Sequence, residues 1–285
     1  MDIGVFQILP DAVADPAKVA KRAEELGFES YWVPEHPILP LESTFPYPGG
    51  APEDPPPDYL WQMPDPFIAL ARASAATDKI KLGTGICLVP ERNPLLLAKE
   101  IATLDAYSGG RFLFGIGAGW HKEECEIMGG DFDHRWSQVK HSILAMKELW
   151  TKDVSEYHGD YYDFPPVRSF PKPAQQPHPP VIMGGVGSQR VFKRVVEWGN
   201  GWMPLVESVD DIAAGVSALR QYSEEAGRNP GELDVTAFSL PGQWETGEDV
   251  ATLEQAGANR MVLWLGEGDL EQMYGRLETL AAAML

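Results

Sequence analysis

Residues 80–116, IKLGTGICLVPERNPLLLAKEIATLDAYSGGRFLFGI, contain the pattern that decides the fold. Two short runs rich in apolar residues, 80–88 and 111–116, predict strands. Between them, Pro94 starts a helix that runs to about Tyr107, because proline suits the first helical position. A strand, a helix and a strand in this order indicate two parallel strands joined by a helical crossover.

The same alternation extends over the whole chain of 285 residues. Further strands are predicted at 3–9, 30–33, 180–183, 201–205, 233–238 and 261–265, and further helices at 16–26, 66–76, 135–150, 188–198, 209–226, 248–256 and 269–283. Eight strand–helix units favour a closed (β/α)8 TIM barrel over an open doubly wound sheet, which remains the alternative. We therefore expect a single α/β barrel domain over residues 1–285.

Two stretches interrupt the alternation. Residues 37–64, after the second strand, are dense in proline, which excludes a helix or a central strand there. We expect a lid-like insertion, with an inert surface loop as the alternative. Residues 152–179, before the fifth strand, include a hairpin that turns at Gly159 and covers the barrel.

Composition excludes several classes of protein. The net charge of -19 argues against a nucleic-acid partner, because binding phosphates needs clustered Lys and Arg. No apolar run approaches the roughly 20 residues that span a bilayer, and the N-terminus does not read as a signal peptide. Cys87 and Cys125 are too few for a disulfide framework, so we expect free thiols and a cytoplasmic protein.

A glycine-rich turn follows the predicted fifth strand. Gly184, Gly185, Val186, Gly187, Ser188 and Gln189 lead directly from this strand into a helix. The free amides of a helix start, its dipole and close backbone approach favour binding of a phosphate. The lysine of a P-loop is missing, which argues against cleavage of a nucleoside triphosphate. The alternative is a tight turn that only packs the helix on the strand.

The predicted fourth strand also ends in glycines, Gly117, Ala118 and Gly119 after Gly115. The spacing does not match the dinucleotide fingerprint, which needs two residues between its second and third glycines. A strand end without side chains instead lets a planar ring approach the backbone closely. Trp120 follows and either walls this pocket or packs in its rim.

Titratable and polar residues at other strand ends complete the list of candidates. Glu35 and His36 follow the second strand, where a histidine beside a carboxylate can transfer a proton near neutral pH. A structural role and a metal site are the alternatives, but no HExxH spacing or cysteine cluster supports a metal. Gln7 ends the first strand as a cofactor-binding candidate, and Arg111 is expected to pair with a carboxylate below the barrel.

Several of these segments resemble the luciferase-like monooxygenase superfamily, especially its actinobacterial branch that uses coenzyme F420. The resemblance rests on SYWVPEHP at 30–37, LGTGICLVPERNP at 82–94, SGGRFLFGIGAGW at 108–120, and LWT, HGDYYDF, PHPPVIMGG and GNGWMP between 149 and 204. It covers residues 1 to about 205 in order, and beyond them only the barrel pattern supports it.

The resemblance implies an oxidoreductase that moves a hydride between C5 of F420 and a small organic substrate, or alternatively an FMN-dependent monooxygenase. It implies a non-prolyl cis peptide between Gly85 and Ile86 against the cofactor ring, residues 117–119 beside that ring, and residues 185–189 around the phosphate. His36 is similar to a histidine near the reactive ring. The resemblance also implies a homodimer. Trp120 departs from the glutamate of some deazaflavin dehydrogenases, so a sugar-phosphate substrate does not follow.

Overall fold

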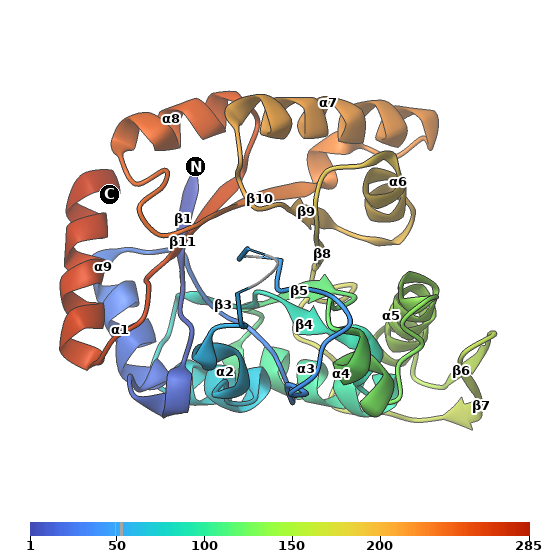
Figure 1. The fold of residues 1–285 in the computed structure, drawn as a ribbon. Coiled ribbons are helices and arrows are strands. Elements are labelled where there is room, and N and C mark those ends of the chain that lie inside the picture. The colour runs from blue at the N-terminus through green and yellow to red at the C-terminus, as the bar shows by residue number, and fades with distance from the viewer. Residues whose placement is uncertain (49, 52–53) are drawn as a thin grey trace.

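Parallel strands form a closed barrel in this computed structural model, which describes residues 1–48, 50–51 and 54–285 (Figure 1). The strands are β1 (Asp2–Phe6), β2 (Ser30–Val33), β3 (Lys81–Thr84), β4 (Cys87–Leu88), β5 (Phe112–Gly117), β8 (Val181–Gly184), β9 (Gly201–Met203), β10 (Asp234–Ser239) and β11 (Arg260–Trp264). Their order is β3-β2-β1-β11-β10-β9-β8-β5-β4, and pairing of β3 with β5 closes the ring. The predicted (β/α)8 barrel is confirmed, and the open sheet is wrong.

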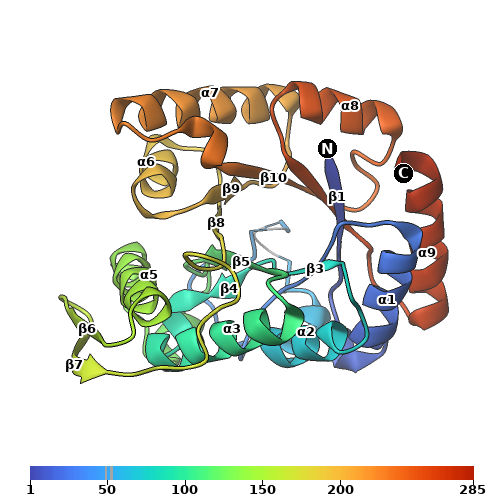
Figure 2. The ribbon, with the colours of Figure 1, turned by 180° about the vertical axis from the view of Figure 1, so that it is seen from behind.

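Helices surround the barrel on its outer side (Figures 1 and 2). They are α1 (Pro16–Leu26), α2 (Pro66–Ser74), α3 (Pro94–Ser108), α4 (Lys122–Ile127), α5 (Arg135–Thr151), α6 (Gln189–Trp198), α7 (Val209–Glu225), α8 (Gly247–Gln255) and α9 (Leu270–Met284). Short 3-10 helices are η1 (Pro10–Ala12), η2 (Asp58–Trp61), η3 (Val89–Glu91) and η4 (Pro230–Glu232). Among the described residues, no helix combines the length and apolarity that a membrane crossing requires.

Capping residues explain why the helices begin where the sequence predicts. Asp15 accepts a hydrogen bond from the amide of Ala17 at the start of α1, and Gly27 ends that helix with a φ of 98°. Asn93 caps α3 in the same way, directly before Pro94. These local signals place the start of each crossover helix.

The sequence prediction differs from the structure in three places. The predicted third strand is two strands, β3 and β4, separated at Gly85–Ile86, where the peptide bond is cis as the resemblance implies. β1 ends at Phe6, before the expected residue 9, because the chain turns into η1 at Pro10. Helix α4 was not predicted, since its six residues are too few to show a helical period.

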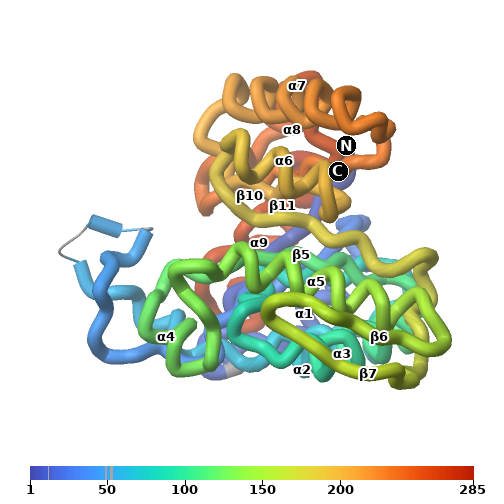
Figure 3. Tube along the Cα trace, turned by 90° about the vertical axis from the view of Figure 1, so that its right-hand side faces the viewer, coloured from blue at the N-terminus to red at the C-terminus, as the bar shows by residue number. Residues whose placement is uncertain are grey.

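The predicted insertions flank the barrel. Residues 37–64 form an irregular segment beside α4 that contains η2, and residues 49, 52 and 53 of this segment lie outside the described residues (Figure 3). The expected hairpin is β6 (Ser155–His158) paired antiparallel with β7 (Asp163–Val167), and Gly159 lies in its turn. The hairpin lies outside α5 (Figure 1).

Trp32 occupies the middle of the barrel, where glycines on neighbouring strands make room for it. A Cβ added to Gly83 would lie 2.2 Å from the indole ring of Trp32. Around it lies an apolar cluster of Phe6, Ile8, Tyr59, Leu60, Leu113, Ile182, Met203, Phe238 and Val262. The barrel is therefore packed with side chains, and any ligand must bind at its mouth.

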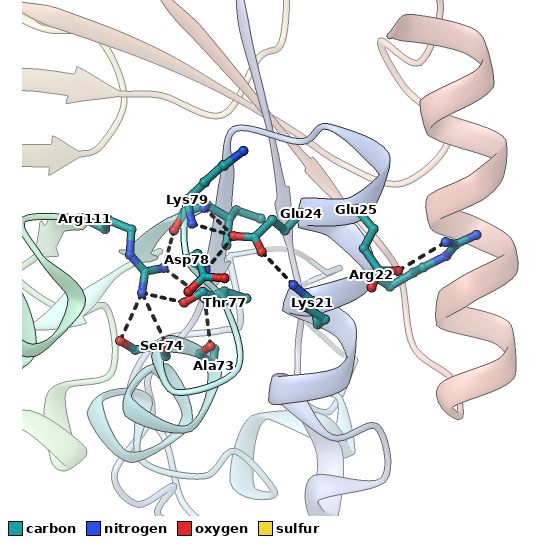
Figure 4. A network of polar contacts seen from close by, with 11 residues as sticks. Lys21, Arg22, Glu24, Glu25, Ala73, Ser74, Thr77, Asp78, Lys79 and Arg111 are labelled. Atoms are coloured by element: carbon teal, nitrogen blue, oxygen red, sulfur yellow. Dashed lines mark hydrogen bonds and ion pairs between the residues drawn. The ribbon is translucent and has the colours of Figure 1, made fainter.

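The prediction that Arg111 pairs with a carboxylate is wrong. Its guanidinium instead donates to the carbonyl oxygens of Ile80 and Ser108, at 2.8 and 2.7 Å. It also donates to the hydroxyl of Thr77 at 2.9 Å (Figure 4). The nearby carboxylate of Glu24 accepts from the backbone amides that precede β3. Burial opposes its ionisation, but these amide hydrogen bonds, led by that of Ile80, hold the pKa of Glu24 at about 2.

Candidate active site

His36 and Glu124 form the central polar pair at the carboxyl ends of the strands. Nδ1 of His36 lies 2.7 Å from Oε2 of Glu124, and both side chains are largely buried. His36 follows β2, whereas Glu124 lies on α4, so the fold joins residues 88 positions apart. Glu124 was not predicted as a site residue, because it lies on α4, which is too short to show a helical period in the sequence.

Trp120 and Glu124 together determine which nitrogen of His36 carries the proton. Its indole Nε1 lies 3.4 Å from Nε2 of His36 and can only donate a hydrogen bond. Nε2 of the neutral ring is therefore the acceptor, and Nδ1 carries the proton that is donated to Glu124. The hydrogen bond from Trp120 and the carboxylate of Glu124 therefore favour the same tautomer.

The hydrogen-bond partner of His36 is not Glu35, so the expected pairing of this histidine with the adjacent carboxylate is wrong. The carboxylate of Glu35 accepts from the amide of Leu88 at 2.7 Å and from Nε of Arg92 at 2.6 Å. Arg92 also donates to Asp65 at 2.5 Å. Glu35 therefore fixes β4 and the loop after β2, because adjacent residues of a chain leaving a strand point in different directions.

A second carboxyl group, Glu91 of η3, is buried beside this pair and was not predicted. Its side chain is 2% exposed. Within the described part of the chain, neither oxygen has a hydrogen-bond partner, and Oε1 of Glu124 also has none. Burial, followed by the charge of Glu124, raises the pKa of Glu91 from 4.5 to about 9. Glu91 is therefore a neutral acid at pH 7.

His121, the N-cap of α4, is a further buried group at the same place. Its Nδ1 accepts from the amide of Glu124 at 3.2 Å, so the neutral ring carries its proton on Nε2. Nε2 is buried and has no partner among residues 1–48, 50–51 and 54–285. Burial lowers the pKa of His121, against the charges of Glu124 and Glu123, which favours the neutral ring.

Glycines let Ile86 lie tightly between β5 and β8. A Cβ added to Gly117 would lie 1.8 Å from Cδ1 of Ile86, and one added to Gly184 would lie 3.0 Å from its Cγ2. Gly119 has a φ of 77°, which favours glycine, and Ala118 is buried. The side chain of Ile86 therefore fills the space beside Gly117 and Gly184.

Gln7 is placed differently from the expectation. Its amide nitrogen donates to the carbonyl oxygen of Ala14 at 3.1 Å, and its amide oxygen accepts from the hydroxyl of Tyr31 at 2.5 Å. The side chain is fully buried. Both polar groups are used inside the fold, so the expected cofactor contact through this side chain is wrong.

The glycine-rich turn between β8 and α6 is open to solvent over residues 185–190. The hydroxyl of Ser188 accepts from the amide of Val191 at 3.3 Å and caps α6. The carbonyl oxygen of Gly185 accepts from Nε1 of Trp202 at 2.9 Å, which fixes the turn from below. The amides of Gln189 and the next residue lie in the first turn of the helix, where no intrahelical acceptor exists. This arrangement suits a phosphate.

The insertion at 37–64 closes the other side of the mouth. Thr44 donates its amide proton to Glu123 of α4 at 3.0 Å, and Phe45 stacks on Phe132 with ring centres 5.7 Å apart. Tyr47 lies with its ring centre 5.7 Å from that of Trp120. A cavity of about 180 Å³ lies below this segment, lined by Glu35, His36, Pro37, Met63, Pro64, Asp65, Pro66 and Arg92. In the described parts of the chain, no cluster of three His, Cys, Asp or Glu residues could hold a metal ion.

Comparison with known proteins agrees with this geometry. The family model described as luciferase-like monooxygenase matches residues 7–242. The uncharacterized protein Rv0953c of Mycobacterium tuberculosis is 31% identical over 284 residues, which is 100% of this chain and 99% of that protein. The structure of the coenzyme F420-dependent tetrahydromethanopterin reductase of Methanopyrus kandleri superposes with a TM-score of 0.74 at 21% identity, over 99% of this chain and 98% of that one.

Two partial matches differ in cofactor. The F420-dependent glucose-6-phosphate dehydrogenase of Amycolatopsis mediterranei is 31% identical over 175 residues, 60% of this chain and 47% of that protein. The FMNH(2)-dependent dimethylsulfone monooxygenase of Pseudomonas putida is 36% identical over 153 residues, 50% of this chain and 42% of that protein.

The barrel and its mouth define an oxidoreductase of the kind that uses a flavin or a deazaflavin. This chain belongs to the luciferase-like monooxygenase family.

Proposed function

We propose that the protein is an F420-dependent oxidoreductase acting on a small organic molecule. The observation that carries this proposal is the His36–Glu124 pair, with its 2.7 Å contact, at the same barrel mouth as the glycine-rich strand ends. When bound, the deazaflavin supplies hydride transfer at its ring carbon C5. The protein contributes orientation, proton transfer and exclusion of water.

His36 is the proton-transferring residue of this proposal. Its Nε2 holds a lone pair and takes a proton from a substrate hydroxyl, or returns one in the opposite direction. The imidazolium formed would be stabilised by the carboxylate of Glu124 at Nδ1. Glu35 is a positioning residue: its hydrogen bonds with the amide of Leu88 and with Arg92 hold the loop that carries His36.

The cofactor ring would lie over the cis peptide Gly85–Ile86, at the strand ends of β5 and β8. Gly85, Gly117, Ala118 and Gly119 would face its ring, and the turn from Gly185 through Val186, Gly187, Ser188 and Gln189 would hold its phosphate. The aromatic side chains of Tyr47, Tyr59, Trp120 and Trp264 then leave an apolar opening for the substrate below the 37–64 segment, which we propose acts as a lid.

The test is to titrate the purified protein with F420 and with FMN and to follow cofactor fluorescence. We expect F420 binding, and His36→Ala should reduce turnover by 100-fold or more, a typical loss for a general acid–base group, with the cofactor Kd almost unchanged. Tight binding of FMN with no binding of F420 would reject the cofactor assignment. Retained turnover in His36→Ala would reject the role of His36.

The second candidate is an FMN-dependent monooxygenase. The 36% identity to the dimethylsulfone monooxygenase over 153 residues favours it, and the same turn would hold the phosphate of FMN. Oxygen consumption that depends on reduced FMN and on an added substrate distinguishes this activity from that of the first candidate.

A further inference from the structure

The segments at the mouth of the barrel carry almost no positive charge. The mouth is formed by the segments that follow the carboxyl ends of the strands. They are residues 7–15, 34–65, 85–93, 118–134, 185–188, 204–208, 240–246 and 265–269. Arg92 and Lys122 are their only arginine and lysine, although the chain has 23 such residues. The scarcity of cations is therefore a property of the mouth and not of the whole chain.

Both of these cations are paired with carboxylates of the protein. Arg92 binds Glu35 and Asp65, which lie at the two ends of the 37–64 segment. Nζ of Lys122 lies 3.6 Å from Oε1 of Glu126, one turn further along α4. A substrate that enters the mouth therefore meets cations that are already neutralised.

The 37–64 segment adds negative charge to the entrance. Its charged residues are Glu42, Glu53, Asp54 and Asp58, and it contains no lysine, arginine or histidine. An entrance lined by one sign of charge lowers the local concentration of molecules of that sign. An anionic substrate would thus be repelled before it reaches His36.

The histidines of these segments supply no free positive charge either. His36 gains a charge only with Glu124 beside it, at 2.7 Å, so the pair as a whole stays neutral. Burial lowers the pKa of His121 and favours its neutral ring. Nδ1 of the exposed His134 lies 3.1 Å from the carboxylate of Asp131.

The cavity beside His36 offers no unpaired charge of the opposite sign. Among the described residues that line it, both carboxylates, Glu35 and Asp65, are bound by Arg92. The remaining lining is apolar: Pro37, Met63, Pro64 and Pro66. The volume of about 180 Å³ lies below the roughly 300–1,000 Å³ of pockets for drug-sized ligands, so the cavity suits a small molecule.

Aromatic rings surround the rest of the opening. The ring centres of Tyr47 and Trp120 lie 5.7 Å apart, and those of Tyr59 and Trp264 lie 6.0 Å apart. The hydroxyl groups of Tyr47 and Tyr59 lie 3.1 Å from each other, so one donates to the other. Burial, followed by this hydrogen bond, raises the pKa of Tyr59 and keeps its hydroxyl group uncharged. These rings offer apolar faces to a substrate.

We propose that the substrate is a small uncharged molecule with an apolar ring or chain, whose hydroxyl group donates to Nε2 of His36. The proposal rests on the function proposed above and names the substrate class of that site. A carboxylate or phosphate would lose its water here without gaining a cation, and desolvating an unpaired charge costs far more than burial of apolar surface returns. An ammonium group would likewise find both carboxylates of the cavity occupied by Arg92.

The test uses three probes of one shape that differ in charge: benzyl alcohol, benzoate and benzylammonium. Their Kd values are measured at pH 7 by ligand-observed NMR, for the protein loaded with F420 and for the protein without it. Failure of F420 to bind would reject the cofactor assignment, whereas the order of the probes on the protein alone still tests the substrate class.

We expect benzyl alcohol to bind at least tenfold more tightly than benzoate, and more tightly than benzylammonium. A smaller ratio over benzoate, benzylammonium as the tightest probe, or no binding of benzyl alcohol would each overturn the proposal.

A charge placed in the cavity tests the same reasoning in the opposite direction. Met63→Lys introduces a cation, and Met63→Gln, with an uncharged side chain of similar length, is the matched control. Benzoate should bind to Met63→Lys within threefold of benzyl alcohol, and Met63→Gln should keep the wild-type ratio. A melting curve confirms folding, and Leu39→Lys with Leu39→Gln, at a partly buried position of the same apolar cluster, replaces the pair if Met63→Lys does not fold. A wild-type ratio in the folded lysine variant would show that charge does not select the substrate.

Discussion

The buried acid Glu91 makes a prediction about stability that needs no cofactor. In Glu91→Gln the carboxyl group is replaced by an amide of nearly the same shape, which stays neutral at every pH. We therefore expect the variant to fold and to be more stable than the wild type near neutral pH.

The size of the effect follows from the pKa of Glu91, which folding raises from 4.5 to about 9. A raised pKa means that the unfolded chain ionises first, so stability is lost as the pH rises from 4.5 to 9. Each pH unit in this window costs about 1.4 kcal/mol. The wild type should therefore lose about 3 kcal/mol between pH 4.5, the ordinary value, and pH 7.

The assay is urea denaturation of both proteins between pH 6 and 9.5, followed by fluorescence. The advantage of Glu91→Gln should grow by about 1.4 kcal/mol per pH unit up to pH 8 and level off above about pH 9. Glu207→Gln, at an exposed position, is the control and should stay within about 0.5 kcal/mol of the wild type. A difference that does not vary with pH between 6 and 8 would refute a neutral Glu91.

Three further substitutions test the site. Glu124→Gln should slow turnover at least tenfold and change the cofactor Kd less than threefold in a fluorescence titration, and an unchanged turnover would contradict its role at Nδ1 of His36. Trp120→Phe removes the indole donor but leaves the carboxylate of Glu124 at Nδ1, so ¹⁵N NMR should show a shift of Nε2 while His36 keeps its proton on Nδ1; an unchanged Nε2 shift would contradict the Trp120 hydrogen bond. Gly117→Ala meets Ile86 at 1.8 Å and should lower stability by about 1–3 kcal/mol in thermal or urea denaturation, whereas a wild-type stability would show that Ile86 moves freely.

Local sequence signals were sufficient to predict the barrel fold. Pro16, Pro66 and Pro94 each follow a capping residue and begin a helix where the sequence predicts, because capping and the fixed φ of proline act within a few residues. The strands follow from their apolar runs for the same reason. The predicted homodimer and cytoplasmic location stay predictions.

The polar centre of the site could not be predicted in this way. Glu124 contacts His36 across 88 positions, and the adjacent Glu35 faces Arg92 instead. Glu91 has no sequence signal for burial, since a glutamate between proline and arginine is ordinarily exposed. Gln7 was predicted to face the cofactor, but its side chain is buried in the fold. Its place at a strand end does not reveal whether a polar side chain points into the fold or into the barrel mouth.

Arg92 has a consequence for how this protein could diverge or be engineered. It donates to Glu35 and to Asp65, which lie directly outside the two ends of the 37–64 segment. One guanidinium thus holds both ends of the loop. A graft between Pro37 and Pro64 would change what the mouth admits, and it would preserve the proton-transfer pair if it also kept the contacts of Thr44 with Glu123 and of Tyr47 with Trp120.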